Sequence, residues 1–339
     1  MLRARQHRYP SFDDLLDKYH ERRWTDGLPI VAPTPEAVQQ FLDEAGLEPD
    51  VEAGVVDSWG ARITAEHVAI NAVMAGCRPE YLPVVFAAVK ALARPAANCH
   101  STTATLANPA QLVIVNGPIR TQLGIQCEQG CFGPGHRANA TIGRALRLVV
   151  NNVLRCLPGE LDRSVFSTPS RYSFCFGENE EESPWVPLHI ERGLPVDRSA
   201  VTVFSSLPML LVSTEGTATP EEVLDRYVDR LYYDGMLWER RMGFPADLVV
   251  VVGKEHQRRF AGVGWSKQDI RQWLWERLSA LPGRDGFPYA RQPVRLDGPQ
   301  GILIVAAGGA GNPFTALLTP HAGRAITEVV ELRAHSGGC

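Results

Sequence analysis

The sequence lacks the features that define several protein classes. Its 339 residues contain no apolar run long enough to cross a bilayer. The N-terminal segment MLRARQHRYPSFDDLL has no apolar stretch before its acidic residues, so it does not resemble a secretory signal, and we expect a cytoplasmic protein. The net charge of -4 gives no electrostatic reason to expect nucleic acid or an anionic membrane as a partner. With 45% apolar and 21% charged residues, the composition is typical of a soluble globular protein of one large or two medium domains.

The number of cysteines is odd, which argues against a disulfide framework in a chain of this size. The seven cysteines are Cys77, Cys99, Cys127, Cys131, Cys156, Cys175 and Cys339. Cys77 and Cys156 lie in or beside helical runs, and we expect them to be buried as small hydrophobic residues. Cys339 ends a Ser-Gly-Gly tail, where we expect a mobile thiol without a structural role.

Periodicity and end signals predict an α/β fold. Helices are expected near residues 11–23, 35–42, 63–77, 79–93, 137–155, 220–233 and 267–278. Strands are expected at 112–115, 172–176, 201–204, 248–252 and 326–330, with a further strand before Ala307. The run of Leu, Val and Ile at 112–115 is typical of a sheet that is buried on both faces. In such sheets ligands bind beyond the carboxyl ends of the strands, so the loops there are the first place to expect a site.

Two pairs of similar segments predict two related α/β halves. The segment that starts at Glu66 resembles the one at Glu255, and PAQLVIVNGPI from Pro109 resembles PQGILIVAAGGAG from Pro299. The pairs are offset by 189 and 190 residues, which indicates internal duplication, although α/β proteins share such patterns generally. We expect a helical and irregular arm over 1–60, a first half over 61–195 and a second half over 196–339, packed around a central cleft.

The segment CEQGCFGPGHRANATIGRALRL, residues 127–148, carries the clearest motif. Its Gly-Pro-Gly turn leads into a helix start, where free N–H groups and the helix dipole favour an anion. Arg137 and Arg144 are expected to offer forked contacts to a carboxylate or phosphate, and Asn139 and Thr141 to cap the helix. A simple turn with solvent-facing arginines would give the same pattern. The predicted substrate-binding residues are Gly133, Gly135, Arg137, Asn139, Thr141, Arg144 and, from the loop after the 112–115 strand, Asn116.

The cysteines of this motif allow three interpretations. Cys127 and Cys131 are spaced C-x-x-x-C, so a redox pair would need a tight loop. Cys131 alone, beside a positive helix end and Arg137, would have a lowered pKa and act as a nucleophile. A metal site would join Cys127 and Cys131 with His136, and Cys99 with His100 would be its second ligand pair, but adjacent residues seldom both point at one ion. Packing as an ordinary buried thiol is the alternative to all three.

Further polar residues lie in loops at predicted strand ends. His100 is a candidate general base in a Ser- and Thr-rich loop, and His189 is a second one. Glu178 and Glu180 follow the aromatic strand at 172–176 and are candidate acids or bases, although a solvated acidic loop is equally typical. The glycines of 307–312 lack the G-x-G-x-x-G spacing, so a dinucleotide site is not indicated.

The segments DGLPIVAPT, INAVMAGCRPEYLPVV, LVIVNGPI, FGPGHRANATIGRALRL, YSFCFGENEEESPWVPLHIERG and GWSKQDIRQWLW together support a family resemblance. Over Asp26 to about Val330 the chain resembles a widespread bacterial family associated with UGSC-motif (seleno)proteins. The resemblance implies a UGSC-type thiol or selenol protein as a partner and implies no reaction. In that family the GPG-RAN-TIGRA segment is the steady part and the preceding cysteines are less regular. The C-terminal His-Ser-Gly-Gly-Cys does not match a UGSC motif.

The sequence thus predicts an enzyme, a lyase or transferase, that acts on a small anionic or acyl metabolite. The predicted catalytic residues are Cys131, His100, Glu178 and Glu180, with carbon–sulfur bond formation or cleavage as the chemistry. One alternative is a non-catalytic, substrate-positioning subunit of a heteromer with a UGSC-type protein. The other is a metal-dependent hydrolase or lyase. The cofactor is not indicated, and a homo- or hetero-oligomer is expected.

Overall fold

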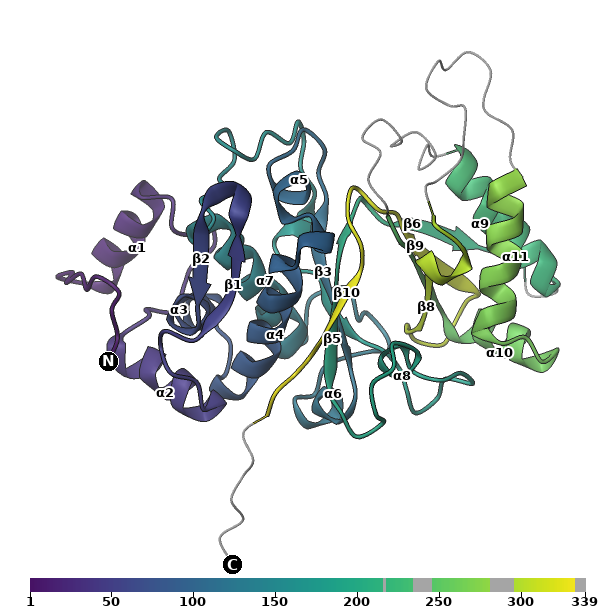
Figure 1. The fold of residues 1–339 in the computed structure, drawn as a ribbon, viewed down its shortest axis with the longest axis horizontal. Helices are drawn as coiled ribbons and strands as arrows, with labels where there is room; N and C mark the ends of the chain where they lie inside the picture. Colours follow the sequence, from purple (N-terminus) through teal and green to yellow (C-terminus); the bar gives the residue numbers. More distant parts are fainter. Residues whose placement is uncertain (216–217, 234–245, 281–295, 333–339) are drawn as a thin grey trace, which may run out of the picture.

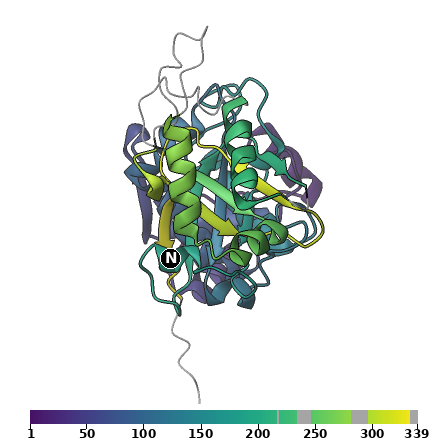
Figure 2. The same ribbon diagram turned by 90° about the vertical axis from the view of Figure 1, so that its right-hand side faces the viewer.

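Two four-stranded sheets lie face to face in the middle of the molecule, with helices on both outer sides (Figure 1). The computed structural model describes residues 1–215, 218–233, 246–280 and 296–332. The layers follow the order helix, sheet, sheet, helix, and the green helices of the last layer stand in front of the second sheet in Figure 2. The predicted α/β class is confirmed.

The first sheet has the strand order β10-β5-β3-β4. Its strands are β3 (Ala110–Asn116), β4 (Cys175–Gly177), β5 (Ala200–Ser206) and β10 (Ile326–Val329). β3 is parallel to β4 and antiparallel to β5, which in turn pairs antiparallel with β10. The strand predicted at 172–176 is shorter and later than expected. The 3-10 turn at Pro169–Arg171 takes up the Tyr172 N–H, which donates to Pro169 O at 3.0 Å, and β4 begins only at Cys175.

Both faces of β3 are buried, as the apolar run predicts. Val113 and Val115 point to the helical layer, whereas Leu112 and Ile114 point to the second sheet. The neighbouring β4 follows the same alternation, since Cys175 packs with the helices and Phe176 packs between the sheets. Alternating side chains therefore build two separate cores from one sheet.

The second sheet has the strand order β6-β9-β7-β8 and is covered by three helices. Its strands are β6 (Leu210–Ser213), β7 (Leu248–Val252), β8 (Ile302–Ala306) and β9 (Phe314–Leu318). The covering helices are α9 (Pro220–Tyr233), α10 (Lys254–Gly262) and α11 (Lys267–Ala280). Val249, Leu303 and Leu318 face the first sheet and close the core between the sheets.

The N-terminal part of the chain forms the other helical layer. Its helices are α1 (Phe12–Glu21), α2 (Pro35–Ala45), α3 (Ala65–Ala75), α4 (Leu82–Ala93) and α5 (Cys99–Thr103), followed later by α6 (Pro118–Gln122) and α7 (Arg137–Asn152). The short α8 (Leu188–Glu191) lies outside this layer, and its Leu188 packs in the core between the sheets. A hairpin of β1 (Glu52–Val56) and β2 (Ala61–Thr64) joins α2 to α3. The predicted N-cap Ser11 accepts from the Asp14 backbone N–H.

The two sheets have the same order and directions of strands, but the strands do not correspond as the sequence comparison predicts. β3 and β7 occupy equivalent positions, since each pairs with one parallel and one antiparallel neighbour. The proposed match of the Pro109 and Pro299 segments is therefore wrong, because the latter leads into β8, the equivalent of β4. Local apolar patterns are alike in any buried strand, so they do not specify which strand corresponds to which.

The predicted boundary at residues 195 and 196 does not separate the sheets. β5 lies beyond that boundary but pairs with β3, and the next strand, β6, joins the second sheet. In the same way β9 belongs to the second sheet, and the next strand, β10, returns to the first. Each sheet therefore has an edge strand, β6 or β10, that directly follows a strand of the other sheet in the chain. Cys339 lies outside the described residues, and no described helix is long and apolar enough to span a membrane.

A buried histidine stabilises the second helical layer. His256 of α10 has no exposed surface, and its Nε2 and Nδ1 atoms lie 2.8 Å from Thr214 Oγ1 and 2.8 Å from Thr315 Oγ1. The Tyr227 hydroxyl is also 3.2 Å from Nδ1. Burial, with a smaller contribution from Arg259, lowers the pKa of His256 to about 4. The folded protein therefore holds this imidazole neutral at pH values where an unfolded chain protonates it.

We predict that acid weakens the fold through His256. A histidine with a pKa of about 4 when folded and ~6.5 when unfolded lowers the free energy of unfolding as the pH falls from 6.5 to 4, by roughly 2 kcal/mol at pH 5. Urea unfolding at pH 7.5 and pH 5.0 measures this loss. The His256→Gln variant should lose less stability between these pH values than the wild type. His100→Gln, at an exposed position, should retain the full loss; an equal loss in His256→Gln would contradict the assignment.

Candidate functional site

The carboxyl ends of parallel strands from both sheets meet at one junction. Asn116 is the last residue of β3, Glu178 follows β4, and Ala306 ends β8. The Glu178 N–H donates to Val115 O at 3.1 Å, and the Asn179 N–H donates to Ala306 O at 2.7 Å. The loop after β4 therefore bridges the two sheets. We call this region the strand-end junction.

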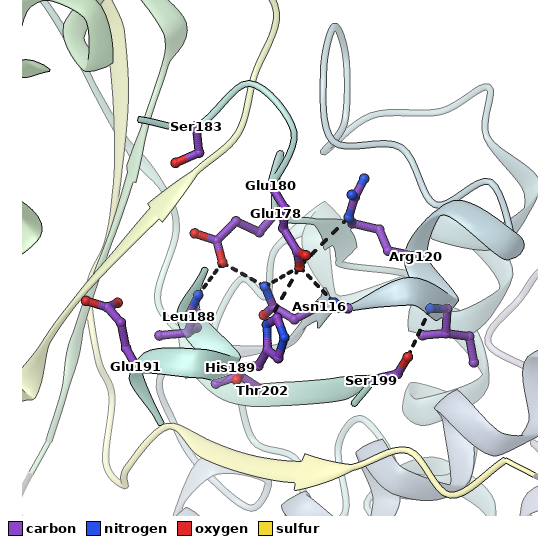
Figure 3. Close-up of polar contacts among 12 residues, drawn as sticks. Asn116, Arg120, Glu178, Glu180, Ser183, Leu188, His189, Glu191, Ser199 and Thr202 are labelled. Carbon is purple, nitrogen blue, oxygen red and sulfur yellow. Dashed lines mark hydrogen bonds and ion pairs between the residues drawn. The ribbon is translucent and has the colours of Figure 1, made fainter. Parts of the chain in front are cut away.

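Three residues predicted from the sequence come together there (Figure 3). The Asn116 side-chain amide donates to Glu178 Oε2 at 2.7 Å and to Glu180 Oε1 at 2.9 Å. The Gly117 N–H also donates to Glu180 Oε1, at 2.7 Å. Gly117 has a φ of +80°, and a Cβ at this position would overlap the Arg198 carbonyl oxygen. Only glycine allows this backbone to reach Glu180.

Glu178 has no exposed surface, and each of its oxygens has two partners. Oε1 lies 3.0 Å from Lys267 Nζ and 3.4 Å from the Ala306 N–H, while Oε2 also accepts from the Leu188 N–H at 2.7 Å. Lys267 is itself only 3% exposed and supplies the opposite charge that a buried carboxylate requires. Both oxygens of Glu178 are thus occupied by contacts to Asn116, Leu188, Lys267 and Ala306, and the acid or base role stays a prediction.

Glu180 is more accessible, with a side chain that is 16% exposed. Its Oε1 atom lies 3.8 Å from Nδ1 of His189, whose ring is completely buried and makes no hydrogen bond. His189, the second histidine suggested by the sequence, is thus the one that lies at the junction. Figure 3 shows its ring beneath the two carboxylates.

Sequence reasoning missed two basic residues of this site, Arg120 and Lys267. Arg120 is 4% exposed, pairs with Glu181, and donates to Cys127 Sγ at 3.6 Å. A Cβ on Gly177 would lie 2.6 Å from Arg120 Cδ, so the glycine that ends β4 makes room for this side chain. The position of Arg120, soon after a buried strand and an Asn-Gly-Pro turn, was the available signal.

A cavity of about 570 Å³ lies beside Cys131, past the ends of β7 and β8. Its described lining is Glu128, Gly130, Cys131, Phe132, Gly133, Met209, Leu211, Val251, Gly253, Ala307, Gly308, Gly309, Ala310, Gly311, Asn312, Phe314 and Ala316. The glycines of 308–311 expose their backbone to the space. The predicted residue Gly133 belongs to this wall.

Burial raises the pKa of Cys131 to about 12, and the nearby Cys127 adds to the effect. The backbone N–H groups of Gly308 and Phe132 act in the opposite direction but do not offset the burial. The predicted lowering of this pKa is therefore wrong, because the loop after β8 covers the sulfur and leaves the residue 6% exposed. Cys131 is a neutral thiol at physiological pH.

Helix α7 begins without the side-chain caps predicted for it. It starts at Arg137 with His136 as N-cap residue, and no side chain caps it. Asn139 instead accepts from the Gln126 N–H at 2.9 Å and donates to Gln126 O at 2.9 Å and Cys131 O at 3.2 Å. Thr141 donates to Arg137 O at 2.8 Å. Asn139 thus fixes the turn that presents Cys131.

The two arginines of the predicted anion cradle have other partners. Arg137 donates to Gly76 O from Nε at 3.1 Å and from Nη2 at 3.0 Å. Arg144 makes a forked contact with Asp26, at 2.8 Å from both Nε and Nη2. Gly135, with a φ of +112°, forms the turn but does not line the cavity in the described structure. The structure therefore does not support the predicted anion cradle, because both arginines bind neighbouring segments and join α7 to them.

His100 does not lie with the other candidates. It is exposed on α5, which leads into the start of β3, whereas Asn116 ends that strand (Figure 1). Its ring lies 5.2 Å from the ring of Trp59. Within the described ranges, no group of three or more His, Cys, Asp or Glu side chains is arranged to hold a metal ion.

We predict that removal of the Lys267 charge destabilises the junction. Lys267→Met leaves Glu178 buried without a counter-charge and should lower the free energy of unfolding by about 3 kcal/mol in urea denaturation. The double variant Glu178→Gln/Lys267→Met should recover most of this loss, and Lys18→Met, at an exposed ion pair, should change stability by less than about 0.5 kcal/mol. A double variant no more stable than Lys267→Met would contradict this pairing.

Comparisons with known proteins do not assign the site. No protein-family model and no curated protein matches the chain. The resemblance to the family associated with UGSC-motif proteins therefore stays a prediction.

Proposed function

We propose that the chain is an enzyme that acts on a small acyl or anionic metabolite in the cavity beside Cys131. The observation that carries this proposal is the composition of the cavity wall. Cys131 is the only thiol or hydroxyl side chain among the described lining residues, and the volume of about 570 Å³ suits a small metabolite. Acyl transfer through a carbon–sulfur bond is the reaction that this arrangement supports best.

The glycine loop supports an acyl substrate. Gly308, Gly309 and Gly311 line the space without side chains. The Gly308 N–H donates to Cys127 O at 2.8 Å and the Gly311 N–H donates to Glu255 Oε1 at 2.9 Å, so within the described residues it is the Gly309 N–H that a substrate carbonyl group can approach. Donors of this kind stabilise the negative oxygen that develops when a thiol attacks an acyl carbon. The apolar side chains of Phe132 and Phe314 would contact the rest of the substrate.

A thiol with a pKa of about 12 needs a base when it attacks. Glu128 is the only carboxylate among the described lining residues, and its carbonyl accepts from the Cys131 N–H at 3.1 Å, so both belong to one turn. Lys254 lies 2.7 Å from Glu128 Oε1. In the proposed step the sulfur bonds to the acyl carbon, the bond to the leaving group breaks, and the thiol proton passes through Glu128 to that group.

A second candidate function is a non-catalytic, substrate-positioning subunit of a heteromer with a UGSC-type protein. The observation that favours it is the raised pKa of Cys131, because a protonated thiol is a weak nucleophile. The partner would then supply the reactive sulfur or selenium to a substrate held in the same cavity.

We predict that Cys131 accepts an acyl group. With p-nitrophenyl acetate as probe, the wild type should release a burst of p-nitrophenol and carry an acetyl group on Cys131 in peptide mass spectrometry. Cys131→Ser should reduce the burst by at least about 100-fold. Cys127→Ser keeps the cavity thiol and should retain the burst, which separates a single thiol from a redox pair. Absence of Cys131 acetylation in the wild type would favour the subunit function.

The reactivity of Cys131 should rise with pH. Because its pKa is about 12, the thiolate fraction and the rate of iodoacetamide alkylation should increase about tenfold per unit between pH 7 and pH 10 without a plateau. Site-resolved mass spectrometry gives this rate. A plateau below pH 9 would show that the sulfur is not shielded as described.

A further inference from the structure

A second pocket lies at the other end of α7 from Cys131. It has a volume of about 510 Å³ and is bounded by the C-terminal half of α7 and the loop that follows. Its lining is His20, Arg23, Thr25, Asp26, Gly27, Arg147, Asn151, Leu157, Pro158, Asp162, Phe166, Ser167, Thr168, Pro169, Arg171 and Tyr172. It shares no lining residue with the Cys131 cavity. The pocket is therefore a separate place on the molecule.

Two buried arginines in its wall share one carboxylate. Arg147 is 7% exposed, Arg171 is 6% exposed and Asp162 is 3% exposed. Asp162 Oδ2 lies 3.1 Å from Arg147 Nη2 and 2.7 Å from Arg171 Nη2, and Oδ1 accepts from Arg171 Nη1 at 3.1 Å. Two positive charges are thus matched by one negative charge.

The remaining contacts do not supply the missing charge. Arg147 donates to Gln111 Oε1 at 3.4 Å. Arg171 donates to Ser164 Oγ at 2.7 Å and to Ser167 Oγ at 3.5 Å, so all three acceptors are neutral. The Nε atom of Arg171 is buried and makes no hydrogen bond. Burial and the proximity of Arg171 lower the pKa of Arg147 to about 10, as expected for an incompletely neutralised pair.

The other charged residues of the wall are already paired. Asp26 is held by the forked contact from Arg144, and Arg23 binds Glu160 at 2.7 Å. Neither pair changes the balance around Asp162. One buried positive charge therefore remains, and a buried charge without a counter-charge is costly to a fold.

We infer that this pocket binds a small anion, a carboxylate or a phosphate, through Arg147 and Arg171. Guanidinium groups bind both anions through forked contacts. Phe166, which is 92% exposed, and Tyr172, which is 50% exposed, line the same pocket and give an organic anion an apolar surface. The site is independent of the chemistry proposed for Cys131.

Thermal unfolding of the full chain tests this inference. Inorganic phosphate and succinate are each added up to 20 mM, with sodium chloride at equal ionic strength as the reference. At least one of them should raise Tm of the wild type by about 2 °C or more, because it binds the folded state only. A response to phosphate alone or to succinate alone identifies the preferred anion. No response to either anion overturns the inference.

Matched variants locate the effect. Arg171→Gln removes the excess charge and leaves Arg147 paired with Asp162, so the protein should fold and lose the anion response at least tenfold in apparent affinity. Arg163→Gln alters a residue of the same loop that does not line the pocket, and it should respond as the wild type does. Arg147→Gln, which leaves Arg171 with Asp162, takes the place of Arg171→Gln if that variant fails to fold. An undiminished response in the folded variant overturns the inference.

Discussion

The placement of one carboxylate, Glu178, holds the two sheets and the candidate site in register. Glu178 directly follows β4. Its oxygens accept from Asn116 at the end of β3, the Leu188 N–H of α8, Lys267 of α11 and the Ala306 N–H of β8. A buried carboxylate is tolerated only when charge and hydrogen bonds are all supplied. The elements that supply them must therefore reach the junction together, and Glu180 and His189 are positioned as a consequence.

The crossing of β6 and β10 between the sheets also fixes the two sheets relative to each other. β6 directly follows β5 of the first sheet but completes the second sheet, and β10 directly follows β9 of the second sheet but completes the first. Leu112 and Val249, one from each sheet, both pack in the core between the sheets. Neither sheet buries its inner face without the other, so the junction and the cavity beside it belong to one cooperative unit.

The parts of this fold that the sequence predicts are those set by local patterns. The run at 248–252 becomes β7, and the helix expected at 220–233 has those bounds, because side-chain period and end signals are local. The sequence predicts Asn116, Glu178 and Glu180 as polar residues at strand ends, and the parallel strands β3 and β4 bring them together.

The sequence does not predict which side chains pair when they are far apart in the chain. Lys267 reaches Glu178 across 89 residues, and Arg120 reaches Glu181 across 61. The predicted sign of the Cys131 pKa shift is wrong for a related reason. The loop after β8, which is far away in the chain, covers the sulfur, and burial raises the pKa by more than the nearby backbone N–H groups lower it. Whether a cysteine is activated is decided by what covers it, and a spacing motif does not contain that information.

The arginines of α7 show that the pairing of charges also depends on residues that are distant in the chain. The sequence offered Arg137 and Arg144 as anion ligands, yet carbonyl oxygens satisfy the first and Asp26 matches the second. Arg147, on the same helix, must share Asp162 with Arg171. The negative end of the helix dipole acts within the last turn, and Arg147 lies before that turn, so the dipole does not replace the missing anion. Anion recognition on this helix is therefore decided by the count of acceptors around each guanidinium, a quantity that appears only once the loop after α7 has folded against it.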